Sequence, residues 1–388
     1  MDYGNQILSA SVWDRWCKLK NRIITRYQYS LLNMFGIFTH FPPLDRLYAK
    51  FARRCIGAYL YSIKLEVNNS CTLSCQMCYI NKGNQVIPFN TITALLDQIQ
   101  SCGVRLEILG GEPLLHNDIV EIIRYAKLVS RVPFVSLYTN GISATEELCH
   151  LLISAGLDAA IVTLISHNEM VHDSFTGHKG SWDKTMQGIQ NFRKARIPVY
   201  TFTAVHRENY RDVDAINDFV KKTLGVHALF YQYIPQFKDD PLMIAPEIWR
   251  QIKHRVLMEM NTKHMEFVRK FFMLTGNSCS GGNFVLTVKA DGSVQPCPFI
   301  SDLPLGDIYQ TDIWNIYRNR YHSTKLARLK QTPEECINCN FQSVCGGGCK
   351  AGNTFLAGDY SHKDHRCLGP HDKPFDMHSV IDCVPTFF

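Results

Sequence analysis

The sequence predicts an α/β protein, with a parallel sheet flanked by helices and then a smaller, loop-rich and cysteine-dense domain. Strand-like apolar runs alternate with amphipathic helical runs from residue 61 to about residue 240. Cysteines then gather beyond residue 278, after a helical connector at about 246–275. Such alternation implies parallel strands joined by right-handed crossovers. A chain of 388 residues also exceeds what one core usually organises, which favours two domains.

A basic, aromatic segment precedes the predicted sheet. Residues 1–60 hold nine Lys or Arg and three Asp or Glu, a difference of +6 that equals the formal charge of the whole chain. We expect amphipathic helix broken by Pro42-Pro43, packed as a lid on the main domain. Two alternatives are peripheral membrane contact through residues 1–40 and a docking surface for an acidic partner.

The sheet region contains six predicted strands and five predicted helices. The strands are 62–67, 105–109, 134–139, 159–166, 199–206 and 228–234. The helices are 91–102, 117–130, 145–155, 182–196 and 210–224. Ligand chemistry is expected at the carboxyl ends of the strands, because loops there build the active sites of barrel-like sheets.

The later part of the chain divides into three further units. A connector is expected at 241–278, a cysteine-dense domain at 279–370 and a tail at 371–388. The dipeptide Asp291-Gly292 between alternating runs predicts a hairpin of strands 284–288 and 293–295.

Composition limits the functional classes. The apolar fraction of 46% and charged fraction of 20% are those of a soluble globular protein, and no run of eighteen apolar residues occurs. Since the N-terminus lacks the features of a secretory signal, a cytoplasmic location is expected, with membrane association as an addition. Fifteen cysteines in a reducing compartment indicate ligation of metals or clusters rather than disulfides.

Three cysteines follow the first predicted strand directly. Cys71, Cys75 and Cys78 on one short loop can hold three corners of a 4Fe-4S cube. The fourth iron would keep an open position for a reacting molecule, as a catalytic zinc does. By themselves the three thiolates are equally compatible with part of a zinc site.

A second motif stands at the end of the second strand. Gly110-Gly111-Glu112-Pro113 follows the cysteine loop by one strand, and this order resembles the radical S-adenosylmethionine enzymes. The resemblance implies a partial (β/α)6 TIM-like barrel that binds S-adenosylmethionine on a 4Fe-4S cluster. It implies cofactor contacts from this motif, with Glu112 on the methionyl amino group. It also places Asn140 of Thr139-Asn140-Gly141 and Thr163 beside the cofactor.

Two positions depart from the family pattern. Thr163-Leu164-Ile165-Ser166 stands where peptide-modifying relatives often have Ser-x-Asp-Gly, and Met77 replaces the usual aromatic residue before the third cysteine. The missing Asp leaves the catalytic acid and base unassigned.

Seven cysteines in the C-terminal region form a second spaced group. They are Cys279, Cys297, Cys336, Cys339, Cys345, Cys349 and Cys367. Their spacing resembles the SPASM domain of radical S-adenosylmethionine enzymes, whereas a zinc pair would need a second C-x2-C knuckle. The resemblance implies one cluster on Cys336, Cys339, Cys345 and Cys367 and another on Cys279, Cys297 and Cys349, whose fourth ligand stays open.

The resemblance implies an oxidoreductase-like enzyme that reductively cleaves S-adenosylmethionine to a 5'-deoxyadenosyl radical, which abstracts hydrogen from a substrate. A peptide or protein is the leading substrate, and a sugar, tetrapyrrole, lipid precursor or other small molecule is the alternative. A reading from another class is a non-catalytic iron-sulfur electron carrier. Expected partners include a flavodoxin- or ferredoxin-type reductant, and no nucleic acid.

Overall fold

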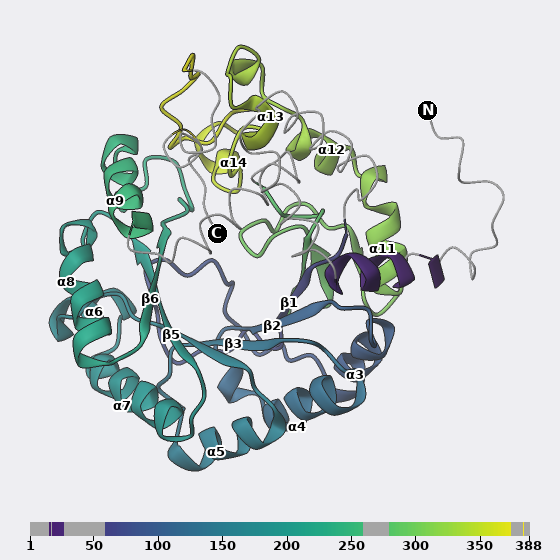
Figure 1. Cartoon of the computed structure of the whole chain (residues 1–388), viewed down its shortest axis with the longest axis vertical. Coiled ribbons are helices and arrows are strands. Elements are labelled where there is room, and N and C mark those ends of the chain that lie inside the picture. Colours follow the sequence, from purple (N-terminus) through teal and green to yellow (C-terminus); the bar gives the residue numbers. More distant parts are fainter. Residues whose placement is uncertain (1–14, 17, 27–58, 259–278, 374–382, 384–388) are drawn as a thin grey trace.

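The parallel sheet predicted from the sequence is present in the computed structural model, which describes residues 15–16, 18–26, 59–258, 279–373 and 383. Its strands are β1 (Ser62–Glu66), β2 (Arg105–Leu109), β3 (Val135–Thr139), β4 (Ala159–Thr163), β5 (Val199–Val205) and β6 (His227–Gln232). Each pairs in parallel with the next along the chain. The sheet curves into an arc with its helices on the outside (Figure 1).

The outer helices largely follow the predicted positions. They are α3 (Phe89–Gln98), α4 (Ile119–Arg124), α5 (Glu146–Ala155), α6 (Glu169–Thr176), α7 (Ser181–Lys194) and α8 (Val213–Asp218). Helices α4 and α8 continue as π-helical turns, Tyr125–Val129 and Phe219–Thr223. Helix α6 was not predicted. It is short, and it begins where the Asn168 side chain accepts a hydrogen bond from the Val171 N–H at 3.3 Å.

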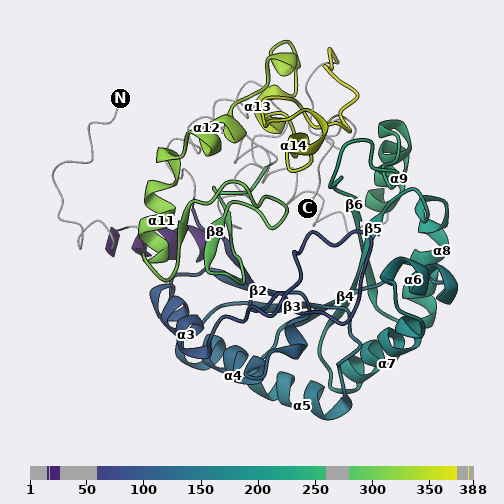
Figure 2. The same cartoon turned by 180° about the vertical axis from the view of Figure 1, so that it is seen from behind.

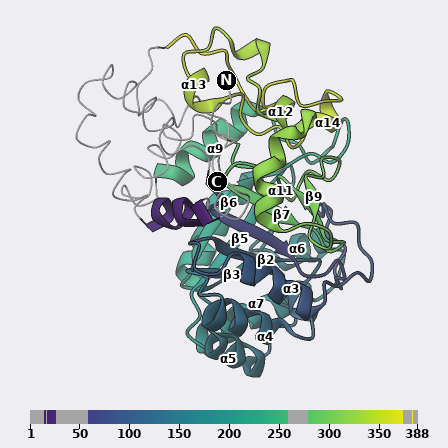
Figure 3. The ribbon, with the colours of Figure 1, turned by 90° about the vertical axis from the view of Figure 1, so that its right-hand side faces the viewer.

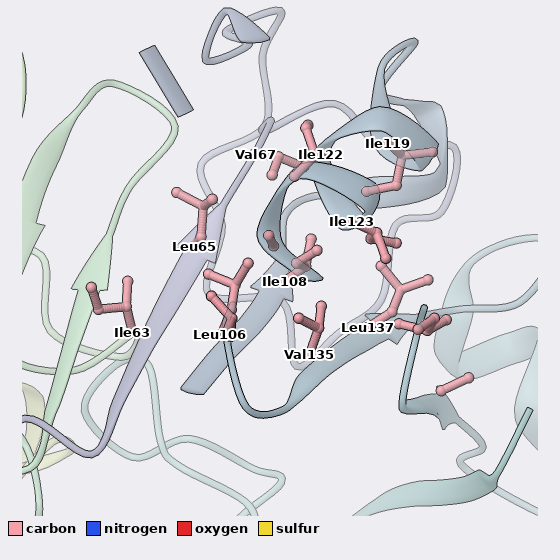
Figure 4. Close-up of a cluster of buried hydrophobic side chains, with 14 of the residues drawn as sticks. Ile63, Leu65, Val67, Leu106, Ile108, Ile119, Ile122, Ile123, Val135 and Leu137 are labelled. Atoms are coloured by element: carbon pink, nitrogen blue, oxygen red, sulfur yellow. The ribbon is translucent and has the colours of Figure 1, made fainter. Parts of the chain in front are cut away.

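The main core lies between the sheet and these helices. Because successive strand side chains point to opposite faces, one residue in two on each strand points outward. Ile63 and Leu65 of β1 and Leu106 and Ile108 of β2 are fully buried in this way, close to α4 (Figure 4). The intervening side chains therefore face the inside of the arc.

The cysteine-dense region adds strands to the same sheet. Strand β7 (Val285–Val288) pairs in parallel with β1, and β8 (Ser293–Gln295) and β9 (Gly306–Asp307) continue the sheet in antiparallel fashion. The predicted hairpin is confirmed, but its attachment to β1 was not foreseen. The strand order β6-β5-β4-β3-β2-β1-β7-β8-β9 fixes the two predicted domains to each other through one sheet.

The remaining α-helices lie across the ring of the molecule from α4 and α5, with α9 beside β6 (Figures 1 and 2). They are α9 (Pro246–Met258), α11 (Ile313–Asn319), α12 (Thr324–Lys330), α13 (Gln342–Cys345) and α14 (Asn353–Leu356). Helix α9 forms the first part of the predicted connector, and residues 259–278 lie outside the described residues. In side view, α12, α13 and α14 lie on the side of the molecule opposite α4 and α5 (Figure 3).

The described part of the N-terminal segment is helical and packs on the barrel. The Asn21 side chain donates to the carbonyls of Leu60 and Cys102 at 3.0 and 2.9 Å and accepts from the Leu60 N–H at 2.8 Å. These contacts lie where the chain enters β1 and β2, so this helix sits at the end of the barrel opposite the cysteine loop. Most of residues 1–60, including Pro42-Pro43, lies outside the described part. Among the residues that the structure describes, no helix combines the length and apolar character needed to cross a bilayer.

Candidate functional site

The first cysteine loop leaves the carboxyl end of β1 and is closed at its base by amide side chains. The Asn69 side chain donates to the Asn81 carbonyl at 3.1 Å and accepts from the Gln85 N–H at 2.8 Å. The Lys82 ammonium donates to the Leu73 carbonyl across the loop. These bonds hold the loop in one shape.

Helix α6 supports the same loop from the side. The N–H groups of Ser74 and Gln76 donate to the carbonyls of Thr176 and Phe175 at 2.8 and 3.0 Å. Met77 packs against the small apolar cluster that includes Phe175. The helix that sequence reasoning missed therefore positions the backbone around Cys75.

The Cys75 thiol needs a metal to be ionised at neutral pH. Burial, with Cys78 and Cys71 as neighbours, raises the pKa of the Cys75 thiol to about 12. Metal charge is what converts such thiols to thiolates. The Leu73 N–H and the Asn140 side-chain amide point at the Cys71 sulfur, at 3.5 and 3.8 Å. Donors aimed at sulfur are the surroundings that an iron-sulfur cluster uses.

The glycine pair after β2 lies directly against the backbone that enters the cysteine loop. A Cβ on Gly111 would lie 2.2 Å from the Ser70 carbonyl oxygen, and one on Gly110 would lie 2.6 Å from the Asn68 side-chain oxygen. The N–H groups of Gly111 and Glu112 donate to the carbonyls of Asn68 and Ser70 at 2.9 and 2.7 Å. These glycines therefore fix the cysteine loop on the end of β2, whatever else they contact.

Glu112 joins the ends of β2 and β3. Its carboxylate accepts hydrogen bonds from the Thr139 hydroxyl at 2.6 Å, the Asn140 N–H at 2.8 Å and the Leu114 N–H at 3.0 Å. Burial raises its pKa and these donors oppose the shift, with only 1% of the residue exposed. Pro113 opens the short turn Pro113–Leu115. The structure thus gathers Glu112 and Asn140 beside Cys71, and their contacts to S-adenosylmethionine stay a prediction.

Thr163 ends β4 on the inner face of the sheet and is partly exposed there. Two other residues near strand ends are structural. His206 is fully buried, stacks on Phe175 at 4.2 Å between centroids and has its pKa lowered to about 4 by burial. The buried Tyr233 hydroxyl donates to Asp240 at 2.7 Å.

The inner face of the arc carries an ion pair that the sequence analysis did not single out. Lys64 of β1 and Glu107 of β2 meet at 2.5 Å, and their side chains stay 22% and 18% exposed on central strands. The Lys64 ammonium lies 5.3 Å from the centre of the Tyr138 ring. Burial raises the pKa of Glu107, but Lys64 lowers it further, so the carboxylate stays ionised. The sequence did contain a sign of this pair, because charged residues such as Lys64 and Glu107 are unusual in the strands of a parallel sheet.

A second ion pair lies between the two cysteine groups. Lys289, which follows β7, meets Glu66 at 2.8 Å and lies 4.9 Å from the centre of the Tyr79 ring. Tyr79 follows Cys78 directly, and its ring packs on Phe299 at 4.8 Å between centroids. The Tyr79–Phe299 contact therefore connects the first cysteine loop with the segment that carries Cys297.

The seven C-terminal cysteines separate into the two expected sets. One small hollow is lined by Cys336, Cys339, Cys345 and Cys367 together. Cys279, Cys297 and Cys349 form the other set, close enough that each affects the charge state of a neighbour. Burial raises the pKa of the Cys297 thiol to about 12 and that of Cys349 to about 11.

Donors also point at these sulfurs. The N–H groups of Gly369 and His371 lie 3.3 and 3.4 Å from the sulfurs of Cys367 and Cys339. The Lys330 ammonium lies 3.6 Å from the Cys279 sulfur. The thiols and the N–H donors aimed at their sulfurs fit iron-sulfur clusters, although the ligand roles of the individual cysteines stay predictions.

Comparison with known proteins gives the same two regions. Residues 65–220 match the model of the radical SAM superfamily, and residues 279–340 match SPASM, an iron-sulfur cluster-binding domain. The AdoMet-dependent heme synthase of Methanosarcina barkeri is 26% identical over 338 residues, covering 79% of this chain and 95% of the relative. The PqqA peptide cyclase of Rhizobium meliloti is 24% identical over 333 residues, covering 78% and 85%.

A solved structure has the same fold. Native anSMEcpe with bound AdoMet aligns with a TM-score of 0.66 at 15% identity, covering 79% of this chain and 94% of that one.

Proposed function

Because this chain belongs to the radical SAM superfamily and carries a SPASM domain, we propose that it abstracts hydrogen from a peptide inside the arc of the sheet. The enzyme uses 4Fe-4S clusters and S-adenosylmethionine. The observation that carries the proposal is the convergence of Cys71, Glu112 and Asn140 at the carboxyl ends of β1, β2 and β3. The similarity to a peptide cyclase supports the peptide as substrate.

Each part of the site has a role that its contacts support. Cys71, Cys75 and Cys78 would hold the cluster that, with S-adenosylmethionine bound, supplies the 5'-deoxyadenosyl radical. Glu112 and Asn140 keep the strand ends in register beneath it, through their 2.8 Å hydrogen bond. A flavodoxin- or ferredoxin-type protein is the proposed electron source.

The substrate would occupy the inner face of the sheet. This face combines the Lys64–Glu107 pair with aromatic rings, since Phe202 stacks on Tyr231 at 4.6 Å and meets Tyr138 at 6.4 Å. Partly exposed polar groups among apolar walls are typical of a substrate site. The rings would shield a radical from water, and the ion pair would orient a polar part of the substrate.

The proposal is tested by anaerobic reconstitution followed by product analysis. We expect about twelve irons per chain, about four for each of three clusters. After dithionite reduction, S-adenosylmethionine should yield 5'-deoxyadenosine, and a precursor peptide that is a substrate should raise the yield and change mass. Bound zinc without 5'-deoxyadenosine would overturn the enzyme assignment, and stimulation by a tetrapyrrole alone would replace the peptide.

A tetrapyrrole is the second candidate substrate, favoured by the heme synthase relative, 95% of whose length this chain covers. The inner face is compatible with it, because aromatic rings can stack on a flat macrocycle and Lys64 can approach a carboxylate. Parallel assays with precursor peptides and an iron-bound porphyrin carrying propionates decide between the two.

We expect the Lys64→Met variant to lose stability by about 2 kcal/mol, because Glu107 then keeps a poorly solvated charge without its partner. The double variant Lys64→Met/Glu107→Leu should regain most of that loss, since both charges are gone. Chemical denaturation of the two variants and of Glu107→Leu measures the coupling.

The functional part of this prediction is read on the double variant. It should still cleave S-adenosylmethionine without substrate, because the two side chains bind each other and lie beside Tyr138, on the strands rather than on the cysteine loop. It should no longer convert substrate. Full conversion by a folded double variant would show that the ion pair is only structural.

We also propose that the N-terminal helix touches a membrane surface. Trp16, Leu19 and Ile23 lie on one face of it and are 51%, 48% and 48% exposed, with basic residues around them. Apolar side chains flanked by cations suit the boundary of an anionic bilayer.

Flotation with liposomes that contain an anionic phospholipid should carry the protein upward at low salt. The variant Trp16→Ala/Ile23→Ala should float several-fold less, because it removes much of the exposed apolar area that would enter the bilayer. Met170→Ala is the matched control, since Met170 is 78% exposed on α6, the helix that contacts the cysteine loop at the opposite end of the barrel. Wild-type protein that stays with the unbound fraction would contradict the proposal.

A further inference from the structure

A fifth cysteine reaches the hollow lined by Cys336, Cys339, Cys345 and Cys367. Cys383 lies sixteen residues beyond Cys367, lines the same hollow and is only 5% exposed. As one of five cysteines outside the two spaced groups, it has the ordinary explanation of a small buried hydrophobe. Its position among four thiols argues for a different role.

Hydrogen bonds through His371 connect Cys383 to the loop that carries Cys339. The His371 imidazole is hydrogen-bonded to the backbone of Cys383. The His371 N–H points at the Cys339 sulfur at 3.4 Å, and its carbonyl accepts from the Asn340 N–H at 2.9 Å. The Asn340 side chain also donates to the carbonyls of Asp372 and Lys373 at 2.8 and 3.0 Å. Residues 371–373, which follow Cys367, are thus held against the loop that carries Cys339.

Cys367 and Cys383 lie together at a second hollow as well. Both also line an adjacent hollow, whose other walls are Trp249, Arg250, Lys253, Arg366 and Leu368. Three of these residues are cations, which suits a cluster that carries net negative charge with its thiolates. Cys367 and Cys383 therefore line both hollows.

We propose that Cys383 is an exchangeable ligand of the auxiliary cluster, able to take the iron that Cys367 holds. In the exchange, the bond from iron to the Cys367 sulfur breaks and a bond to the Cys383 sulfur forms. The proton of the Cys383 thiol passes to Cys367, so no electron is gained or lost. The cluster can then change one ligand without losing iron. The inference rests on the cluster proposed above for Cys336, Cys339 and Cys345.

The test compares Cys367→Ala, Cys383→Ala and the double variant after anaerobic reconstitution. Each single variant should keep about twelve irons, because four thiolates remain for the cluster. The double variant should hold fewer irons than either single variant, because one iron of a cluster that otherwise has four thiolates is then left without its ligand. The dithionite-reduced electron paramagnetic resonance spectrum of Cys367→Ala should differ from that of the wild type. Cys149→Ala, which alters a buried cysteine of α5, is the control for reconstitution.

Two results would overturn the inference: a folded Cys367→Ala variant that loses as much iron as the double variant, or a double variant that keeps all twelve irons. Wild-type protein with only about eight irons, and no further loss in the double variant, would instead remove the cluster itself, and with it one part of the proposed function. Melting temperatures within a few degrees of the wild type ensure that iron loss is not caused by unfolding.

Discussion

Replacing Cys75 by alanine is expected to reduce 5'-deoxyadenosine formation to the level of a control without enzyme. Cys75 is the middle ligand of the proposed three, so its loss leaves two thiolates for a cluster that already lacks a fourth protein ligand. The backbone around it should keep its place, because the N–H groups of Ser74 and Gln76 remain bonded to Thr176 and Phe175. The variant should therefore fold and still bind about eight irons at the auxiliary sites.

The experiment needs a cysteine whose loss should change nothing but packing. Cys149→Ala serves here too, because Cys149 lies fully buried in α5, within the apolar core and outside both cysteine groups. Iron and sulfide content, 5'-deoxyadenosine yield and melting temperature are measured on both variants side by side. Wild-type yield from Cys75→Ala would disprove the placement of the reactive cluster, whereas equal losses in both variants would indicate a general folding defect.

Much of the barrel could be predicted because its strands are short apolar runs separated by helices of regular period. The strand at Arg105–Leu109 was predicted with its observed bounds, and the hairpin followed from Asp291-Gly292. Helix α6 was missed because eight residues give too little periodicity to identify a helix. The pairing of β7 with β1 joins residues more than two hundred positions apart, which no local pattern encodes.

The parts of the site that depend on cysteine spacing could be predicted from the sequence. The parts that depend on how strands pack together were harder to predict. The cysteines of both groups stand in the motifs themselves, and the structure brings four of them, Cys336, Cys339, Cys345 and Cys367, to one hollow. The Lys64–Glu107 pair was overlooked, although alternation within β1 and β2 already placed both residues on one face. The sequence motif predicts that Gly110 and Gly111 contact S-adenosylmethionine. The structure also shows them close to Asn68 and Ser70.

That backbone contact makes Gly111 a position where a single added methyl group should have a large structural effect. A Cβ there would lie 2.2 Å from the Ser70 carbonyl oxygen and 2.6 Å from the Ser70 carbonyl carbon. Neither atom belongs to a flexible side chain, so the loop must move as a whole. Gly111→Ala should therefore cost about 3 kcal/mol or more, a large part of the stability of a typical domain.

The same movement should reach the cysteines, because Ser70 precedes Cys71 and accepts a 2.7 Å hydrogen bond from the Glu112 N–H. We expect Gly111→Ala to lose about four irons and its S-adenosylmethionine cleavage while keeping the auxiliary clusters. Gly358→Ala is the matched control: nothing lies within 4 Å of its Cβ, and its φ of +85° predicts a cost of only about 1 kcal/mol. If both variants keep full iron and equal stability, the glycine pair does not fix the loop, and direct approach to the cofactor becomes the better explanation of the motif.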